Sequence, residues 1–182
     1  MDARTTCEDV HLALDIRRKL PFKTGQISGI FAEHVLEHLD QREDMPKTLS
    51  ECYRILCPGG VMRIIVPDTE RFLRAYVLED PVLWDQLGWA RLPEDMPTPM
   101  HMINHIFHQN GEHLFGYDFA SLQLVLRQAG FASITRQSFG SSLDPRLAID
   151  RSEHRAYSLY VDARKPALAQ KTGDADRSLP AS

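Results

Sequence analysis

The chain has 182 residues, 43% of them hydrophobic, and a formal net charge of −4, which suits one globular domain with a substantial core. The acidic balance disfavours nucleic acid as a partner, and no apolar run approaches the ~20 residues that span a bilayer. The amino-terminal residues MDARTTCEDVH are polar and are not typical of a secretory signal. Three cysteines without the spacing of a zinc site indicate a reducing, cytoplasmic compartment.

The first elements along the chain alternate between strand and turn. Residues 9–14 (DVHLAL) predict a short strand that runs into Asp15, and residues 20–25 (LPFKTG) predict a turn. Residues 27–33 (ISGIFAE) are apolar on both faces of the predicted strand. That pattern is typical of a buried strand in a parallel sheet.

A helix and a further strand follow. Residues 45–57 predict a helix, because Pro46 suits its first turn and the Pro-Gly-Gly sequence at 58–60 suits its end. Residues 61–66 predict the next strand, in which Arg63 is the polar exception. The apolar stripe of the helix consists of Leu49, Cys52, Tyr53 and Leu56.

Residues 69–79 predict a second helix, with Asp68 or Thr69 as its cap. The segment 81–117 is interrupted by prolines and contains both tryptophans, so it predicts an irregular stretch. A segment of that length between regular elements is usually functional or covers a site. We therefore expect a lid-like insert there.

The end of the chain returns to regular structure. Asp118 predicts the cap of a helix over 119–129, and two strands follow at 132–139 and 156–164. From residue 166 to residue 182 the sequence is polar and lacks periodicity, which predicts a disordered tail.

Four sequence motifs resemble one family. FAEHVLEHL, LSECYRILCPGGVMRIIVPD and LVLRQAGFASI resemble the second half of a class I S-adenosylmethionine-dependent methyltransferase, and specifically the small type 11 methyltransferase-like proteins. LDIRRKLPF resembles a further family segment. The resemblance implies an α/β fold with a Rossmann-like sheet, mostly parallel, with an antiparallel pair of strands at its carboxyl-terminal end. It implies that 9–14, 27–33 and 61–66 are the third, fourth and fifth strands of that sheet.

One departure from the family is large. The family's first strand leads into a glycine-rich loop at the cofactor, and too few residues precede Asp15 to hold that loop and two strands. We therefore expect an N-terminally truncated domain over residues 1–165, with 27–33 at a sheet edge and part of one sheet face uncovered. Either the true start lies upstream, or a second copy or another chain covers the edge, or the sheet has rearranged.

The resemblance also assigns site residues. Asp15 and Ile16 match family positions that bind the adenine end of S-adenosylmethionine, and Glu33 and His34 match positions that contact cofactor and acceptor. His34 is the candidate catalytic base, since the pKa of an unperturbed imidazole lies near neutrality. The competing structural interpretation is a solvated loop acid at Asp15 and a cap of the next turn at Glu33 or His34.

Acceptor-binding residues are expected beyond the strands. His113 and Tyr117 match a family stretch that borders the acceptor pocket. Asp68 follows the strand at 61–66 and either faces the acceptor or caps the next helix. Glu37 and His38 lie one helical turn after His34, and we interpret them as structural.

Three histidines have the spacing of metal ligands on a helix. His101, His105 and His108 would share one face, but only Glu112 lies near enough in sequence to complete a set. We therefore predict no metal site, and these side chains either form a polar lid face or line the acceptor pocket.

Two functions from different classes remain open. The first is a methyltransferase, or its carboxyl-terminal part, that acts on a small-molecule, lipid or sugar acceptor. The second is a non-catalytic methyltransferase-like module that serves as a partner subunit or scaffold, since a fold does not establish a function. A nucleotide-binding oxidoreductase is a weak third possibility, because it too requires a glycine-rich turn.

Overall fold

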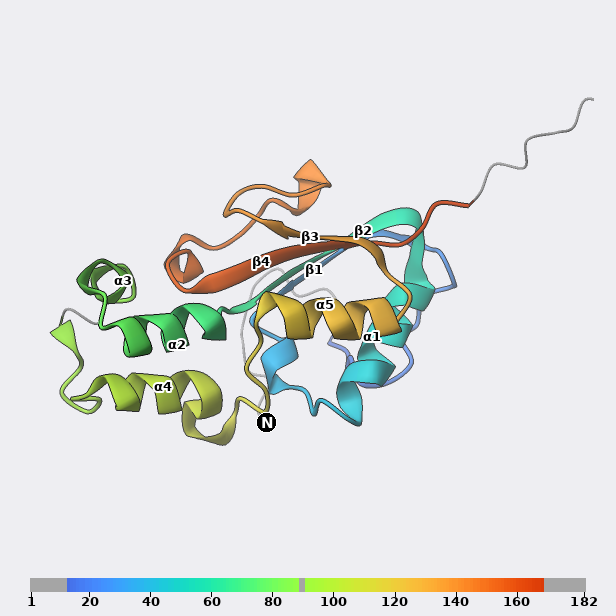
Figure 1. Cartoon of the computed structure of the whole chain (residues 1–182). Helices are drawn as coiled ribbons and strands as arrows, with labels where there is room; N and C mark the ends of the chain where they lie inside the picture. The colour runs from blue at the N-terminus through green and yellow to red at the C-terminus, as the bar shows by residue number, and fades with distance from the viewer. Residues whose placement is uncertain (1–12, 89–90, 169–182) are drawn as a thin grey trace, which may run out of the picture.

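A computed structural model describes residues 13–88 and 91–168 (Figure 1). Its centre is a four-stranded sheet in the order β1-β2-β4-β3. β1 and β2 are parallel, whereas β4 is antiparallel to both of its neighbours, so the sheet is mixed. Within the described residues, β1 forms one edge of the sheet. The strands are β1 (Ile27–Glu33), β2 (Leu56–Pro67), β3 (Ala132–Gln137) and β4 (Ser158–Arg164).

Two helices cover one face of the sheet. α1 (Asp44–Ile55) and α5 (Phe119–Gln128) lie side by side beneath the strands in Figure 1. Alternate residues of the central strands point toward these helices, as the twofold repeat of a strand requires. The buried side chains of this core include Leu49, Met62, Ile64, Val66, Leu122, Leu126, Leu159 and Val161.

The segment 138–157 covers the opposite face of the sheet at β2 and β4. Arg63 points to that face and is fully buried, and its guanidinium donates to the carboxylates of Asp150 and Asp162. It also donates to the backbone carbonyl oxygens of Ser138 and Ser141. These partners hold the segment 138–157 over the sheet. The sequence predicted that part of one sheet face would be uncovered. At β2 and β4 a loop, rather than helices, covers this face.

The same loop reaches β1. A Cβ atom added to Gly29 would lie 3.1 Å from Leu147 Cδ2, so a leucine methyl rests directly on the strand backbone. Leu147 belongs to η4 (Pro145–Leu147), and η5 (Ser152–His154) follows in the same segment. Most β1 residues remain only partly buried, in contrast to β2 and β4. This exposure agrees with the expected position of 27–33 at a sheet edge.

The boundary between α1 and β2 differs from the prediction. The helix ends at Ile55 and the strand begins at Leu56, whereas the sequence predicted a helix to residue 57 and a strand from residue 61. The Pro-Gly-Gly sequence lies inside the strand, where the register with β1 shifts and Gly59 has a φ of +80°. Glycine adopts that conformation without strain, so the turn signal marks a bulge rather than a loop.

The segment 81–117 is more regular than predicted. It contains α3 (Pro81–Gln86) and α4 (Pro99–His108), and α4 packs against α2 (Thr69–Leu78). Phe72, Ala75 and Ile106 form the buried centre of this second cluster. The expectation of an irregular stretch was wrong because two of its prolines begin helices, a position where the missing N–H costs nothing.

The predicted caps are confirmed. The side chain of Asp68 accepts a hydrogen bond from Arg71 N at the start of α2, and Asp118 forms a capping box with Ser121 at the start of α5. The strand predicted at 9–14 lies mostly outside the described residues, and Ala13 and Leu14 are not in a strand. The tail predicted from residue 166 also lies largely outside them.

An ion pair fastens the loop at residue 20 to α1. Glu51 accepts from both Arg54 and the backbone N–H of Leu20, at 2.7 Å for the latter, while Arg54 Nη2 donates to Leu20 O. The hydrogen bond from Arg54 lowers the pKa of Glu51 from 4.5 to about 2. The i, i+3 spacing of Glu51 and Arg54 on α1 thus has a structural role.

The stability that Glu51 contributes depends on pH. Its pKa is lower in the folded state, so the contribution is complete above pH ~4.5 and is lost as the pH falls toward about 2. We expect Glu51→Gln to lower the free energy of unfolding at pH 7 by about 1–2 kcal/mol. Urea titrations of both proteins from pH 7 to pH 3 measure this difference. A difference that does not shrink on acidification would contradict the assignment.

Candidate functional site

The carboxyl ends of β1 and β2 meet at one edge of the sheet. His34 N donates to Ile65 O at 2.8 Å, and Asp68 N donates to Tyr157 O at 2.9 Å. The residue after β1 is thereby held to β2, and the residue after β2 is held to the segment just before β4. In open α/β sheets this is the edge at which ligands bind.

His34 is fixed in an uncommon conformation. Its φ is +52°, which is rare for a residue with a side chain and typical of functional sites when it occurs. His34 Nε2 lies 3.0 Å from Ser158 Oγ, and Nδ1 lies 3.2 Å from Glu37 Oε1. Its ring also stacks on His154, with centroids 4.2 Å apart. Nε2 therefore has a hydrogen-bond partner and Nδ1 faces a carboxylate, so a bound acceptor must displace the Ser158 hydroxyl to exchange a proton at Nε2.

Glu33 is held by an arginine from the loop. Arg151 donates its backbone N–H and its Nε to the two carboxylate oxygens of Glu33, at 3.1 and 2.8 Å. The bond to Glu33 raises the pKa of Arg151. The arginine side chain is 55% exposed, so it can move without leaving a buried charge behind.

Asp15 and Ile16 lie beside α1. The backbone N–H and Nε of Arg17 donate to Asp15, which lowers the pKa of that carboxyl to about 2. Ile16 packs against the main core, and its carbonyl oxygen accepts from Thr48 Oγ1 at 3.3 Å. Asp15 forms ion pairs with Arg17 and Arg18 of the same loop. These contacts do not bring it together with Glu33 or His34.

Two of the three predicted acceptor-binding residues, Asp68 and Tyr117, are paired, whereas His113 lies against His38. His113 is buried, and burial lowers its pKa. Tyr117 donates its hydroxyl to Gln41 Oε1 at 2.6 Å, and burial raises its pKa above the usual range. Asp68 forms a parallel bridge with Tyr117, and burial raises the pKa of its carboxyl. Asp68 thus both caps α2 and borders the site.

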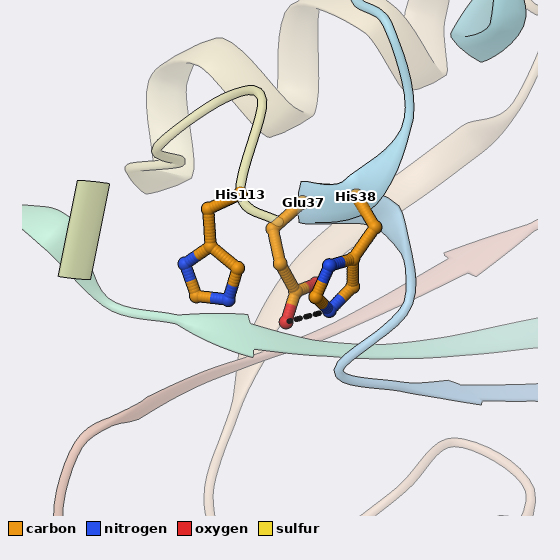
Figure 2. A group of neighbouring side chains, drawn as sticks. All are labelled: Glu37, His38 and His113. Carbon is orange, nitrogen blue, oxygen red and sulfur yellow. Dashed lines mark ion pairs between the residues drawn. The ribbon is translucent and has the colours of Figure 1, made fainter. Parts of the chain in front are cut away.

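Glu37 and His38 are interpreted from the sequence as structural residues, whereas the fold places them beside the candidate site. They belong to η1 (Leu36–His38), which follows β1 directly. The Glu37 side chain is 1% exposed, and neither of its carboxylate oxygens has a hydrogen-bond partner among the described residues. In Figure 2 this carboxylate lies between the rings of His38 and His113. The repeated Glu-His pair in EHVLEH was the signal for these residues.

The three histidines of α4 are arranged differently. His101 and His108 are exposed, and His101 Nδ1 lies 2.7 Å from Thr98 Oγ1. In the part of the chain that the structure describes, three potential metal ligands converge at Glu37, His38 and His113 instead. The helical spacing at 101–108 therefore places these histidines on one face of α4, where no group of three potential ligands is found among the described residues.

Two open grooves lie beside the carboxyl edge of the sheet, and His34 lines neither of them. One has a volume of about 300 Å³ and is lined by Asp68, Arg71 and Arg136, among others. The other has a volume of about 560 Å³ and is lined mostly by α2, with Phe107 on its far side. Among the described residues, no helix is long and apolar enough to cross a membrane.

Comparison with known proteins supports the resemblance. Residues 2–64 match the model of the methyltransferase domain family. No curated protein matches significantly. Two solved structures share the fold with a TM-score of 0.50: a possible exported protein from Bordetella parapertussis (15% identity) and an O-methyltransferase family protein from Burkholderia thailandensis (14% identity).

The chain covers only part of these relatives. The alignment spans 85% of this chain and 43% of the Bordetella protein, and 86% of this chain and 36% of the Burkholderia protein. The chain therefore spans less than half the length of either structure. The family match and the shared fold are consistent with a class I methyltransferase, as the sequence motifs indicated.

Proposed function

We propose that this chain, with its class I methyltransferase fold, is an S-adenosylmethionine-dependent methyltransferase or the carboxyl-terminal part of one. The acceptor class is a small molecule, a lipid or a sugar. The observation that carries the proposal is the convergence of His34 and Asp68 at the carboxyl edge of β1 and β2, within a chain that matches the methyltransferase domain. Cys52 is buried, Cys57 is partly buried, and both are free thiols. Free cysteines are typical of a reducing compartment, so the proposed location is cytoplasmic.

The exposure of two side chains supports binding of the adenosine end of the cofactor. The Asp15 carboxylate is 32% exposed and reachable, and the Arg151 side chain that holds Glu33 is exposed and can swing aside. In our proposal Asp15, Ile16 and Glu33 hold this end. When bound, S-adenosylmethionine supplies an electrophilic methyl group.

The protein's own contribution is position and proton transfer. His34 would accept a proton from the acceptor at Nε2 after the bond to Ser158 is released, and Glu37 beside Nδ1 would stabilise the resulting imidazolium. His113, Tyr117 and Asp68 would line the acceptor side. Holding both reactants in line accounts for much of the barrier reduction in such displacements.

Calorimetric titration of the full chain with S-adenosylmethionine and S-adenosylhomocysteine tests the proposal. We expect binding of both with micromolar affinity. A folded chain that binds neither would overturn the catalytic proposal for this chain on its own.

The base role of His34 has a matched pair of variants. His34→Asn tolerates the positive φ, whereas His34→Ala loses the side chain and strains the backbone. Removal of a general base typically lowers the rate 10²–10⁴-fold, so we expect both variants to bind cofactor but to transfer the methyl group at that reduced rate. Full activity in His34→Asn would exclude the base role.

A second function, a non-catalytic partner module, is favoured by one observation. Arg151 binds Glu33, and the ring of His154 lies 4.2 Å from the ring of His34, so the protein's own loop covers the edge where a ligand would bind. In that case the edge of β1 would pair with a second copy or another chain. Sedimentation at high concentration tests this pairing, and a stable monomer that also binds no cofactor would leave only a partner of another sequence.

A further inference from the structure

We propose that Glu37, His38 and His113 form a binding site for a divalent transition-metal ion, with Zn²⁺ as the reference ion. One ligand atom from each side chain lies within 4.8 Å of the other two (Figure 2). Two imidazoles and one carboxylate are a donor set that binds zinc with a further position open to water or a ligand. Imidazole nitrogen also disfavours Mg²⁺ and Ca²⁺, which prefer oxygen ligands.

The histidines are oriented as metal ligands are. His113 Nδ1 lies 2.7 Å from Ile106 O, and His38 Nδ1 lies 3.0 Å from Glu112 O. A carbonyl oxygen only accepts, so each Nδ1 carries the proton and each Nε2 keeps its lone pair. Metal-binding histidines use the same arrangement, in which the other ring nitrogen donates to a backbone carbonyl or carboxylate.

The carboxylate supplies the second, independent observation. The Glu37 side chain is 1% exposed, yet neither oxygen has a hydrogen-bond partner within the described ranges. A buried carboxylate without hydrogen bonds is costly, and buried charges are normally paired or bind metals. His34 Nδ1 at 3.2 Å and His38 Nε2 at 4.0 Å face Oε1, but neither contact is a hydrogen bond, and each is an ion pair only when the imidazole is protonated. A cation at this position would satisfy the carboxylate.

The backbone already brings the two contributing segments together. Glu37 O accepts from both Leu114 N and Phe115 N, at 2.8 and 3.2 Å, which fixes the segment at 113–115 against η1. Ligand atoms around tetrahedral zinc lie about 3.3 Å apart, so the side chains must close by up to about 1.5 Å. The His38 side chain is 28% exposed and provides the route by which an ion enters.

Zinc binding by the full chain tests the proposal. After treatment with chelator and dialysis, we expect one Zn²⁺ per chain, measured by competition with a chromophoric chelator. His38→Ala should weaken binding at least tenfold, because this partly exposed ligand can be removed with little effect on the core. Glu37→Gln should weaken it similarly.

The matched control is His101→Ala, which removes an exposed histidine outside the cluster. We expect its zinc affinity to equal that of the unaltered chain. Two outcomes would overturn the proposal: no stoichiometric zinc binding by the folded chain, or equal affinities for His38→Ala and the unaltered chain. Zinc binding is measured directly and does not depend on methyl transfer. Failure of the zinc proposal therefore leaves the methyltransferase proposal intact, and failure of the methyltransferase proposal leaves the zinc proposal intact.

Discussion

Arg63→Leu is expected to destabilise the protein by about 3–5 kcal/mol, the cost of removing one partner from a buried ion pair. The substitution would leave the carboxylates of Asp150 and Asp162 without their cation, and the side chains of all three residues are fully buried. It would also free the segment 138–157 from the sheet. Urea or thermal unfolding measures the loss.

The control for this variant is Arg136→Leu. Arg136 is also paired with carboxylates, those of Asp68 and Glu70, but its side chain is 47% exposed. Exposed pairs contribute about 0–1 kcal/mol, so we expect a small effect. Equal effects of the two substitutions would show that the Arg63 network does not hold the loop to the sheet.

Leu126→Ala should cost about 2–5 kcal/mol, because truncation of a buried leucine leaves a cavity. Leu126 is completely buried on α5, where it joins the core between that helix and the sheet. Chemical denaturation gives the change in the free energy of unfolding. Since this helix covers one face of the sheet, its packing contributes much of the stability of the fold.

Leu124→Ala on the same helix is the matched comparison. Leu124 is 57% exposed, so the same chemical change removes little buried surface. We expect a change within about 0.5 kcal/mol, as for most surface substitutions. A large effect at Leu124 would mean that α5 faces another surface in solution.

The sequence predicted the elements whose patterns are local. The strand at 27–33 agrees with β1, and the caps at Asp68 and Asp118 begin α2 and α5 as expected. Each of these signals depends on side chains close together in the chain. The pairing of the last two strands followed from the family resemblance and is confirmed.

Predictions failed where a local signal had two meanings. The glycines after Pro58 predicted a loop but form a bulge, because pairing with β1 extends the strand past them. The prolines of 81–117 predicted irregularity but begin α3 and α4. In both cases the residue types allow two local conformations, and tertiary contacts determine which one forms.

The candidate site shows the same division. Position in the chain placed Glu33, His34 and Asp68 at the ends of strands, and the structure agrees. It gave no indication that Arg151, more than a hundred residues later, would occupy Glu33. Likewise, His38 and His113 are far apart in sequence, and only the fold reveals their approach to Glu37.

The loop that seals the sheet also closes the ligand edge, so ligand affinity and local stability are thermodynamically linked. Any ligand that contacts Glu33 must select molecules in which Arg151 has moved away, and its apparent affinity falls in proportion to their population. The amides of Gly140 and Leu143, which donate to Asp150 and Asp162, report that opening through hydrogen exchange. Weakening the network anchored by Arg63 should therefore accelerate exchange at these amides and, in variants that stay folded, strengthen binding at the edge.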